Sequence, residues 1–164
     1  MLIIVHTRMG MQKTKSIDIS TLATLEQMNA MNKNTIMEQL DIVYTDMGVN
    51  FITGTMPVTP KTHQPMGLLH GGASCVLAES LGSMGSALIA DSRKNNITGI
   101  EINANHIKGK TEGMVTGKAT LIHYGRTTHL WQIEITDEVG ALVCISRLTV
   151  LIVPKPNLSE NASK

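Results

Sequence analysis

One segment constrains the fold of this chain more than any other, because it is long, apolar and almost free of charge. Between Gly67 and Ala90 the only Asp, Glu, Lys or Arg is Glu79. An apolar stripe with the spacing of a helix runs through the segment: Leu77, Leu81, Met84 and Leu88. A helix with so little charge on any side is expected at the centre of a domain, covered by other elements.

The start of this segment and its single carboxylate are the candidate chemistry. Gly71 and Gly72 supply the backbone freedom for a tight turn after His70, so we predict a helix over residues 72–91. Glu79 falls opposite the apolar stripe. A lone carboxylate in apolar surroundings is costly to keep ionised, which favours a catalytic role.

The alternative interpretation is a solvated polar face, which Glu79 would share with Cys75, Ser83 and Ser86. Solvated helix faces usually carry several charges, and this one carries a single charge. The small residues Gly82 and Gly85 also indicate that neighbouring chain approaches the helix closely. Both observations favour a central helix.

Composition narrows the classes of function. A chain of 164 residues, 42% of them hydrophobic, is long enough for one domain with its own core. The formal net charge is +1 and there is no basic block, so we expect no nucleic-acid partner. We find neither a signal peptide nor an apolar run of membrane-spanning length, so we expect no membrane association.

Other catalytic chemistries fit less well. The segment from Gly72 to Val76 lacks the closing glycine of a Gly-x-Ser-x-Gly nucleophile turn. Cys75 beside a histidine is an alternative nucleophile, but a cysteine inside a helix is more often inert packing. Cys75 and Cys144 form no CxxC pattern, so we expect no metal site and a reducing, cytoplasmic setting.

Turn signals divide the rest of the chain into one short helix and six strands. The helix is predicted over residues 20–31, with Asp18 or Ser20 as its cap. The strands are predicted at residues 41–46, 50–58, 97–107, 114–124, 127–136 and 141–153. One long helix among strands joined by hairpins is an α+β plan with an antiparallel sheet.

The domain is predicted to span residues 17–154. An N-terminal extension over residues 1–16, which includes the alternative initiator Met11, has no clear periodicity and is expected to be disordered. A C-terminal tail over residues 155–164 is expected to be frayed.

Two motifs together resemble a known family. His70-Gly71-Gly72-Ala73-Ser74 leads to Leu77-Ala78-Glu79-Ser80, and a predicted strand carries Glu101-Ile102-Asn103-Ala104-Asn105-His106. This combination resembles the hotdog-fold acyl-CoA thioesterases. The branch is the one containing phenylacetate-pathway-like, 1,4-dihydroxy-2-naphthoyl-CoA and enterobactin proofreading thioesterases. The resemblance covers roughly residues 22–154; the N-terminal extension and one extra residue after Ala90 depart from it.

The resemblance implies a hotdog fold, in which an antiparallel sheet wraps around a long central helix. It also implies a homodimer with one continuous sheet, assembling into a homotetramer, with the active site at the dimer interface. Glu79 resembles the catalytic carboxylate and Gly71 the backbone N–H donor to the thioester oxygen. Gln64 and His70 resemble substrate-orienting residues, and Ser83 a hydroxyl that positions water or the carboxylate.

General chemistry agrees with these roles. Attack on a thioester carbonyl creates an oxyanion, which an N–H at a helix N-terminus stabilises. Glu79 lies eight residues after Gly71, or roughly 12 Å along the helix axis, so we expect them to serve one site from different subunits. Whether Glu79 is a general base or a nucleophile stays open. No cofactor is expected, because coenzyme A is part of the substrate.

The resemblance also implies contacts to coenzyme A, or to a carrier-protein pantetheine arm, from a glycine and two segments. These residues are Gly99, His106, Ile107, Lys108, Gly109, His123, Tyr124, Gly125, Arg126, Thr127 and Thr128. Lys108, Lys110 and Arg126 are candidate phosphate ligands because they lie at neighbouring strand ends, with plain solvation as the alternative. A structural role explains His106 as well as a ligand contact does.

We therefore expect a thioesterase acting on an aromatic or bulky acyl-CoA. The leading candidate is 1,4-dihydroxy-2-naphthoyl-CoA, from menaquinone biosynthesis. One alternative is a proofreading thioesterase for misloaded aryl or acyl carrier protein. A non-catalytic module that binds acyl-CoA is less favoured, because no DNA-binding segment fits outside the domain and Glu79, Gln64 and His70 are all present.

Overall fold

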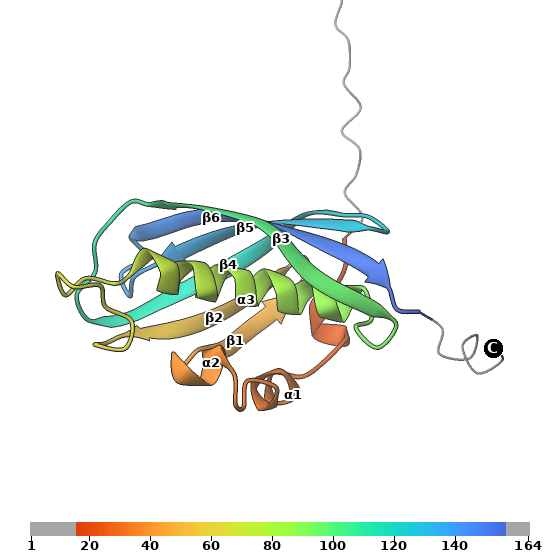
Figure 1. Cartoon of the computed structure of the whole chain (residues 1–164), viewed down its shortest axis with the longest axis horizontal. Coiled ribbons are helices and arrows are strands. Elements are labelled where there is room, and N and C mark those ends of the chain that lie inside the picture. The colour runs from red at the N-terminus through yellow and green to blue at the C-terminus, as the bar shows by residue number, and fades with distance from the viewer. Residues whose placement is uncertain (1–15, 157–164) are drawn as a thin grey trace, which may run out of the picture.

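An antiparallel sheet curls around one long helix in the computed structural model, which describes residues 16–156 (Figure 1). In this part of the chain the sheet has six strands in the order β1-β2-β4-β5-β6-β3. The elements are β1 (Val43–Gly48), β2 (Phe51–Val58), α3 (Gly71–Ile89), β3 (Asn95–His106), β4 (Gly113–Tyr124), β5 (Thr128–Thr136) and β6 (Leu142–Pro154). This arrangement confirms the predicted α+β plan. The rest of the predicted extension and tail, including Met11, lies outside the described residues.

The connection between β3 and β4 differs from the prediction. Both strands were expected to follow one another through a hairpin, but β3 pairs with β6 at the edge of the sheet. Residues 107–112 therefore cross from the β3 edge to β4, past β5 and β6. Turn residues alone mark where a strand ends, and they do not specify which strand it pairs with. The turn at 137–140 does form the predicted hairpin, with Gly140 at φ 81°.

Between residue 16 and the first strand the chain forms three short helices instead of the one predicted over residues 20–31. They are η1 (Ile19–Thr21), α1 (Leu25–Ala30) and α2 (Ile36–Gln39). The longer helix is interrupted because Thr24 and Gln27 form a capping box, in which each side chain accepts the other's backbone N–H. Asp18 caps η1 rather than α1, and Ser20 caps neither helix.

The two edges of the sheet are treated differently. Along β1, the side-chain amide of Asn29 accepts the Tyr44 N–H at 2.8 Å and donates to the Tyr44 carbonyl at 2.9 Å. Asn32 donates to the carbonyl of Ile42 at 2.9 Å. These contacts replace the hydrogen bonds of a further strand and close that edge. Among the described residues nothing covers β3 in this way, and its Ile100 is 56% exposed.

The part of the buried face of α3 that packs against Trp131 of β5 consists of small residues, whereas Leu77 and Leu81 fill the rest of that face. Trp131 is fully buried and its indole N–H donates to the Ser86 hydroxyl at 2.8 Å. A Cβ on Gly85 would lie 2.5 Å from this ring, and one on Gly82 would lie 2.6 Å from a methyl of Leu148. Ser86, which was placed on the polar face with Glu79, is therefore a core residue.

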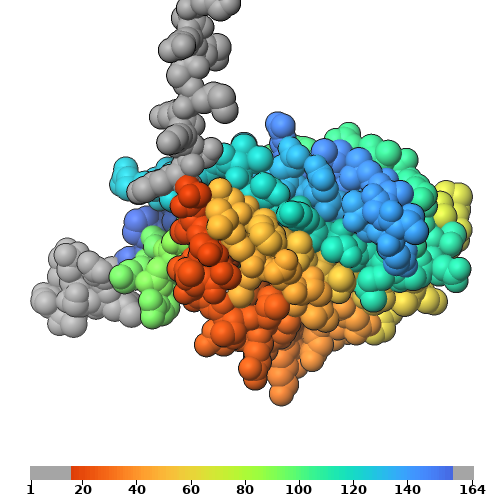
Figure 2. Space-filling view, turned by 180° about the vertical axis from the view of Figure 1, so that it is seen from behind, coloured from red at the N-terminus to blue at the C-terminus, as the bar shows by residue number. Residues whose placement is uncertain are grey.

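The helix α3 is also long and apolar enough to cross a membrane by length and composition alone. It packs against strands β2 to β6, so we interpret it as the core helix of the domain. In the space-filling view from behind, strands of the sheet form much of the visible surface, with the red and orange N-terminal segment beside them (Figure 2).

Replacing Gly85 by alanine tests this packing. In an isolated helix the change would stabilise by about 1 kcal/mol through helix propensity. Here we expect the free energy of unfolding to fall by about 1–3 kcal/mol, because the added methyl group overpacks against Trp131. Urea denaturation measures the sign directly. A stabilised variant would contradict the packing described above.

Candidate active site

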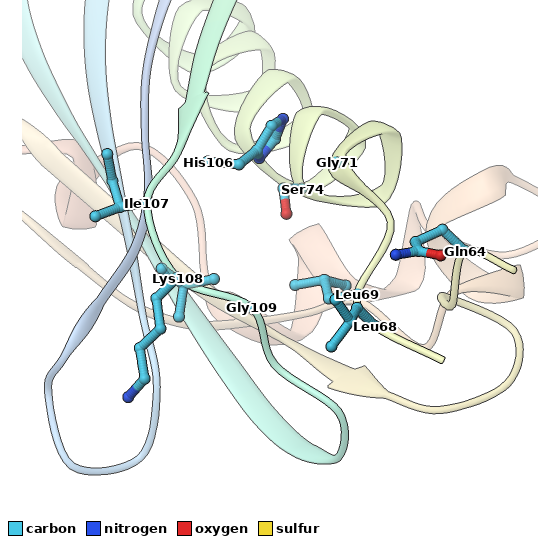
Figure 3. Close-up of a pocket in the computed structure, with 10 residues that line it drawn as sticks. Gln64, Leu68, Leu69, Gly71, Ser74, His106, Ile107, Lys108 and Gly109 are labelled. Atoms are coloured by element: carbon cyan, nitrogen blue, oxygen red, sulfur yellow. The ribbon is translucent and has the colours of Figure 1, made fainter. Parts of the chain in front are cut away.

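A cavity of about 260 Å³ lies at the N-terminus of α3, between the loop before the helix and the end of β3 (Figure 3). It brings together Gln64 and Gly71 from the predicted catalytic set with the whole segment His106–Gly109 from the predicted binding set. The remaining lining residues are Leu68, Leu69, Ser74 and Val143. The backbone of the loop is fixed on both sides: Leu69 donates to the Lys110 carbonyl at 2.7 Å, and His70 to the Thr62 carbonyl at 2.8 Å.

His70 is the N-cap of α3. Its Nδ1 accepts the N–H of Gly72 at 2.8 Å, so in the neutral ring the proton is on Nε2, which remains available as a donor. Histidine is an uncommon cap, so the residue type alone did not predict this role. The N–H of Gly71 has no hydrogen-bond partner among the described residues, although it begins the helix and borders the cavity.

His106 lies against the first turn of α3. A Cβ on Gly71 would be 2.5 Å from Nε2 of this imidazole, so the ring occupies the space that a side chain would need. Figure 3 shows His106 beside that turn, on the β3 side of the cavity. The side-chain oxygen of Gln64 accepts the N–H of Met66, which leaves its NH₂ group as the free donor.

Glu79 lies two turns further along α3 and does not line this cavity. It is exposed in the single chain, with Oε1 beside Gly99, where a Cβ would come within 2.7 Å. The dry surroundings that we expected for Glu79 are therefore not formed by one chain alone. Partial burial of Cys75, and after it the charge of Glu79, raise the pKa of the Cys75 thiol, so a Cys75 nucleophile is disfavoured.

A second cavity, of about 390 Å³, lies between α3 and the segment around α1 and α2, and Glu79 does not line it. It contains Ser83, from the predicted catalytic set, together with Ser80 and Met84 of the helix. The segment around α1 and α2 supplies the facing wall, chiefly with Met31, Asn32, Thr35, Ile36 and Met37. The wall is thus largely apolar. Ser83 and the Gln64–Gly71 group belong to different cavities of one chain.

The predicted coenzyme A contacts fall at opposite ends of the molecule. Tyr124, Gly125 and Arg126 line a third cavity of about 460 Å³ beside Ile89, at the C-terminal end of α3. His123, Thr127 and Thr128 belong to the same hairpin but do not line the cavity. The expectation that this hairpin and residues 106–109 lie at neighbouring strand ends is wrong within one chain, because β3 and β4 are not adjacent.

His129 is a feature of this third cavity that the sequence did not reveal. It is 2% exposed, and its Nδ1 has no hydrogen-bond partner. Burial, followed by the nearby His123, lowers the pKa of His129, so the ring is neutral at pH 7.

Two of the three predicted phosphate ligands are already engaged. Lys108 binds Asp137 at 2.8 Å, and Lys110 binds Glu138 at 2.6 Å. Both acids come from the turn between β5 and β6. The bond from Lys108 lowers the pKa of Asp137, and the bond from Lys110 lowers the pKa of Glu138 to about 2. Among the described residues, Arg126 forms no ion pair.

These two carboxylates make the free energy of unfolding depend on pH in the acid range. Their folded-state pKa values lie below the unfolded values near 4, so their contribution is complete above about pH 4 and disappears as pH falls toward 2. We expect a variant with both Asp137→Asn and Glu138→Gln to lose less stability than the native chain between pH 7 and pH 3. Urea denaturation at the two pH values tests this, and equal losses in both proteins would contradict it.

Four residues that line the first cavity were not among the predicted site residues: Leu68, Leu69, Ser74 and Val143. Leu68 and Leu69 lie in the loop before α3, and apolar residues in a loop carry no signal of a catalytic cavity. Val143 comes from β6, and only the pairing of β6 with β3 places it beside His106. That pairing has no local signal in the sequence.

Comparisons with known proteins agree with this fold and site. The family model of the thioesterase superfamily matches residues 66–144. The chain is 47% identical over 129 residues to a 1,4-dihydroxy-2-naphthoyl-CoA hydrolase of Escherichia coli, covering 79% of this chain and 94% of that protein. It is 46% identical over the same length to the proofreading thioesterase EntH of Cronobacter sakazakii, covering 79% and 93%.

A crystal structure of a mutant thioesterase from Pseudomonas aeruginosa superimposes on the domain. The TM-score is 0.79 at 49% identity, and the match covers 81% of this chain and 96% of that one. This chain therefore belongs to the thioesterase superfamily. The predicted hotdog fold and thioester-hydrolase class are confirmed.

Proposed function

We propose that this protein hydrolyses aromatic or otherwise bulky acyl-CoA thioesters, with Glu79 as general base or nucleophile. The observation that carries the proposal is the N–H of Gly71 at the start of α3, which has no partner among the described residues, on the same helix as a carboxylate that lies beside Gly99 of the open edge strand β3. The N–H would stabilise the oxyanion of the reacting carbonyl, at about 3 kcal/mol for one such donor.

Two chains would supply these groups to one site. Gly71 lies at the His106 end of β3 and Glu79 lies beside Gly99. Gly99 and His106 are equally far from the midpoint between Ile102 and Asn103. If the open edge of β3 pairs with a second β3 about a two-fold axis at that midpoint, Gly99 faces His106 of the other copy.

In this register the Glu79 carboxylate of one chain and the Gly71 N–H of the other would lie beside facing residues of two paired strands. The backbones of such strands are about 4.8 Å apart. The second chain would also cover Glu79, which one chain leaves exposed. The same pairing would bring the Asn95 end of β3 in one copy close to the His106 end of β3 in the other, where residues 107–109 leave the sheet. The cavity lined by Arg126 in one chain would then adjoin the cavity lined by Gln64 in the other. Both predicted coenzyme A segments, one from each chain, would therefore contact the same substrate molecule.

The chemistry needs no further group. As general base, Glu79 would take a proton from water while the water oxygen attacks the thioester carbon; the tetrahedral intermediate then expels the coenzyme A thiolate. As nucleophile, its carboxylate oxygen would displace the thiolate and form an anhydride, which water then hydrolyses. In both cases a thiolate leaves readily and the Gly71 N–H holds the oxyanion. Gln64 and His70 each retain a free donor to orient the substrate.

The acyl group would enter the cavity lined by Met84, Ile36 and Met31, which favours a bulky apolar or aromatic group. Within that class, 1,4-dihydroxy-2-naphthoyl-CoA is our leading substrate, consistent with the name of the Escherichia coli relative. This would place the protein in menaquinone biosynthesis, as a cytoplasmic homotetramer. The alternative is misloaded aryl or acyl carrier protein, suggested by the near-equal identity to the proofreading relative.

Turnover of a substrate panel with Glu79→Gln tests the reaction. Thiol release would be followed with 1,4-dihydroxy-2-naphthoyl-CoA, benzoyl-CoA, acetyl-CoA and a misloaded aryl carrier protein. We expect kcat for the preferred substrate to fall by at least about a hundredfold while the fold is retained, because the group that activates or performs the attack is lost. Glu112→Gln, an exposed carboxylate that lines none of the cavities, is the matched control and should retain full turnover. Normal turnover by Glu79→Gln would refute the mechanism.

Subunit mixing tests the two-chain site. Gly71→Pro removes the N–H at the first helical position, and His70 at φ −70° and ψ 130° is compatible with a following proline. Its Cβ would also displace the His106 ring, so Gly71→Ala, which adds the Cβ and keeps the N–H, is the matched control. Gly71→Pro and Glu79→Gln should each be nearly inactive alone. Refolding Gly71→Pro and Glu79→Gln together should restore about a quarter of native turnover, because half of the dimers are mixed and one of their two sites is intact. Unchanged low activity would show that both groups act within one chain.

A further inference from the structure

We propose that Asp137, in the turn between β5 and β6, is a positioning residue that holds one wall of the substrate cavity through Lys108. The inference rests on the proposed function, since it concerns the same cavity. It assigns Lys108 a different task from the phosphate ligation that the resemblance implied.

Asp137 is the fixed member of the ion pair. Its side chain is 7% exposed, and one carboxylate oxygen accepts the N–H groups of Ala141 at 2.8 Å and Val139 at 3.1 Å. The other oxygen accepts from Lys108 at 2.8 Å. Because hydrogen bonds within its own turn fix the Asp137 carboxylate, it is a fixed acceptor that restricts the position of the long Lys108 side chain.

The backbone that this bond holds is a wall of the cavity. The N–H groups of Ile107 and Lys108 both donate to the carbonyl of Val143, at 2.8 and 3.2 Å. Beyond them the chain leaves the sheet as the crossover to β4. Ile107, Lys108 and Gly109 line the cavity together with Gly71 and Gln64. The ion pair therefore acts where the wall loses its strand hydrogen bonds.

The neighbouring ion pair provides a comparison within the same turn. Glu138 binds Lys110 and accepts the N–H of Met114, at the start of β4. Neither Lys110 nor Met114 lines the cavity. Glu138→Gln and Asp137→Asn thus remove the same charge one residue apart, but only Asp137→Asn releases the cavity wall.

The two roles of Lys108 predict opposite results. If Lys108 binds a substrate phosphate and Asp137 competes for it, Asp137→Asn frees the lysine and lowers KM. If Asp137 positions the wall, the same change loosens the wall and raises KM. The reacting groups Glu79 and Gly71 are not touched in either case, so kcat should stay close to native.

The experiment measures steady-state kinetics of Asp137→Asn, Lys108→Met and the double variant on the best acyl-CoA substrate, well below the melting temperature. We expect KM to rise about fivefold in each single variant, kcat to stay within about twofold, and the double variant to be no worse than either single one. Glu138→Gln should change KM by less than about twofold. A lower or unchanged KM in Asp137→Asn, or additive effects in the double variant, would overturn the proposal.

Hydrogen exchange of the substrate-free protein supplies a readout that needs no turnover. We expect the amides of Ile107 and Lys108 to exchange faster in Asp137→Asn than in the native chain, and at the native rate in Glu138→Gln. Native rates in Asp137→Asn would refute the positioning role. An absence of hydrolysis by the native protein would instead refute the proposed function, while the exchange result would still decide the inference.

Discussion

The packing of α3 into the curled sheet is the constraint on which the rest of the structure depends. Gly82 and Gly85 allow the ring of Trp131 to lie against the helix, and Ser86 satisfies its indole N–H. This contact sets the rotation of the helix about its axis. Gly82 and Ser86 follow Glu79 by three and seven residues, so Glu79 lies at the margin of this buried contact, exposed beside Gly99 at the open edge of the sheet.

The rotation and length of the helix also explain why the Gly71 N–H and the Glu79 carboxylate lie far apart within one chain. The N-terminus of α3 meets His106 at one end of β3, and Glu79 meets Gly99 near the other end. No bend of a continuous helix brings these two points together. A second copy, if paired along β3, would bring the two points together with no change inside either chain, which is why we propose that the reaction takes place between two protomers. The closed β1 edge, held by Asn29, leaves β3 as the edge suited to such pairing.

Local patterns in the sequence predicted much of the fold. The helix and all six strands were expected within two residues of their observed bounds, because each has strong periodicity and clear turn residues at its ends. The short N-terminal helices were wrong in detail: the signal was present in Thr24 and Gln27, but the apolar spacing of residues 20–31 masked it. The pairing of β3 with β6 is a long-range contact that no local pattern records.

The candidate site was predictable only as a set of residues. Gln64, Gly71 and the 106–109 segment do converge, whereas Ser83 and the 123–128 hairpin lie in separate cavities. The ion pairs of Lys108 and Lys110 were missed because Asp137 and Glu138 lie 28 or more residues away in sequence. The most direct test of the account is a crystal structure with a non-hydrolysable acyl-CoA ketone analogue. We expect its carbonyl oxygen to accept the Gly71 N–H of one chain while the Glu79 carboxylate of the other chain approaches its carbonyl carbon. A carbonyl bound by neither group, or by both from one chain, would contradict it.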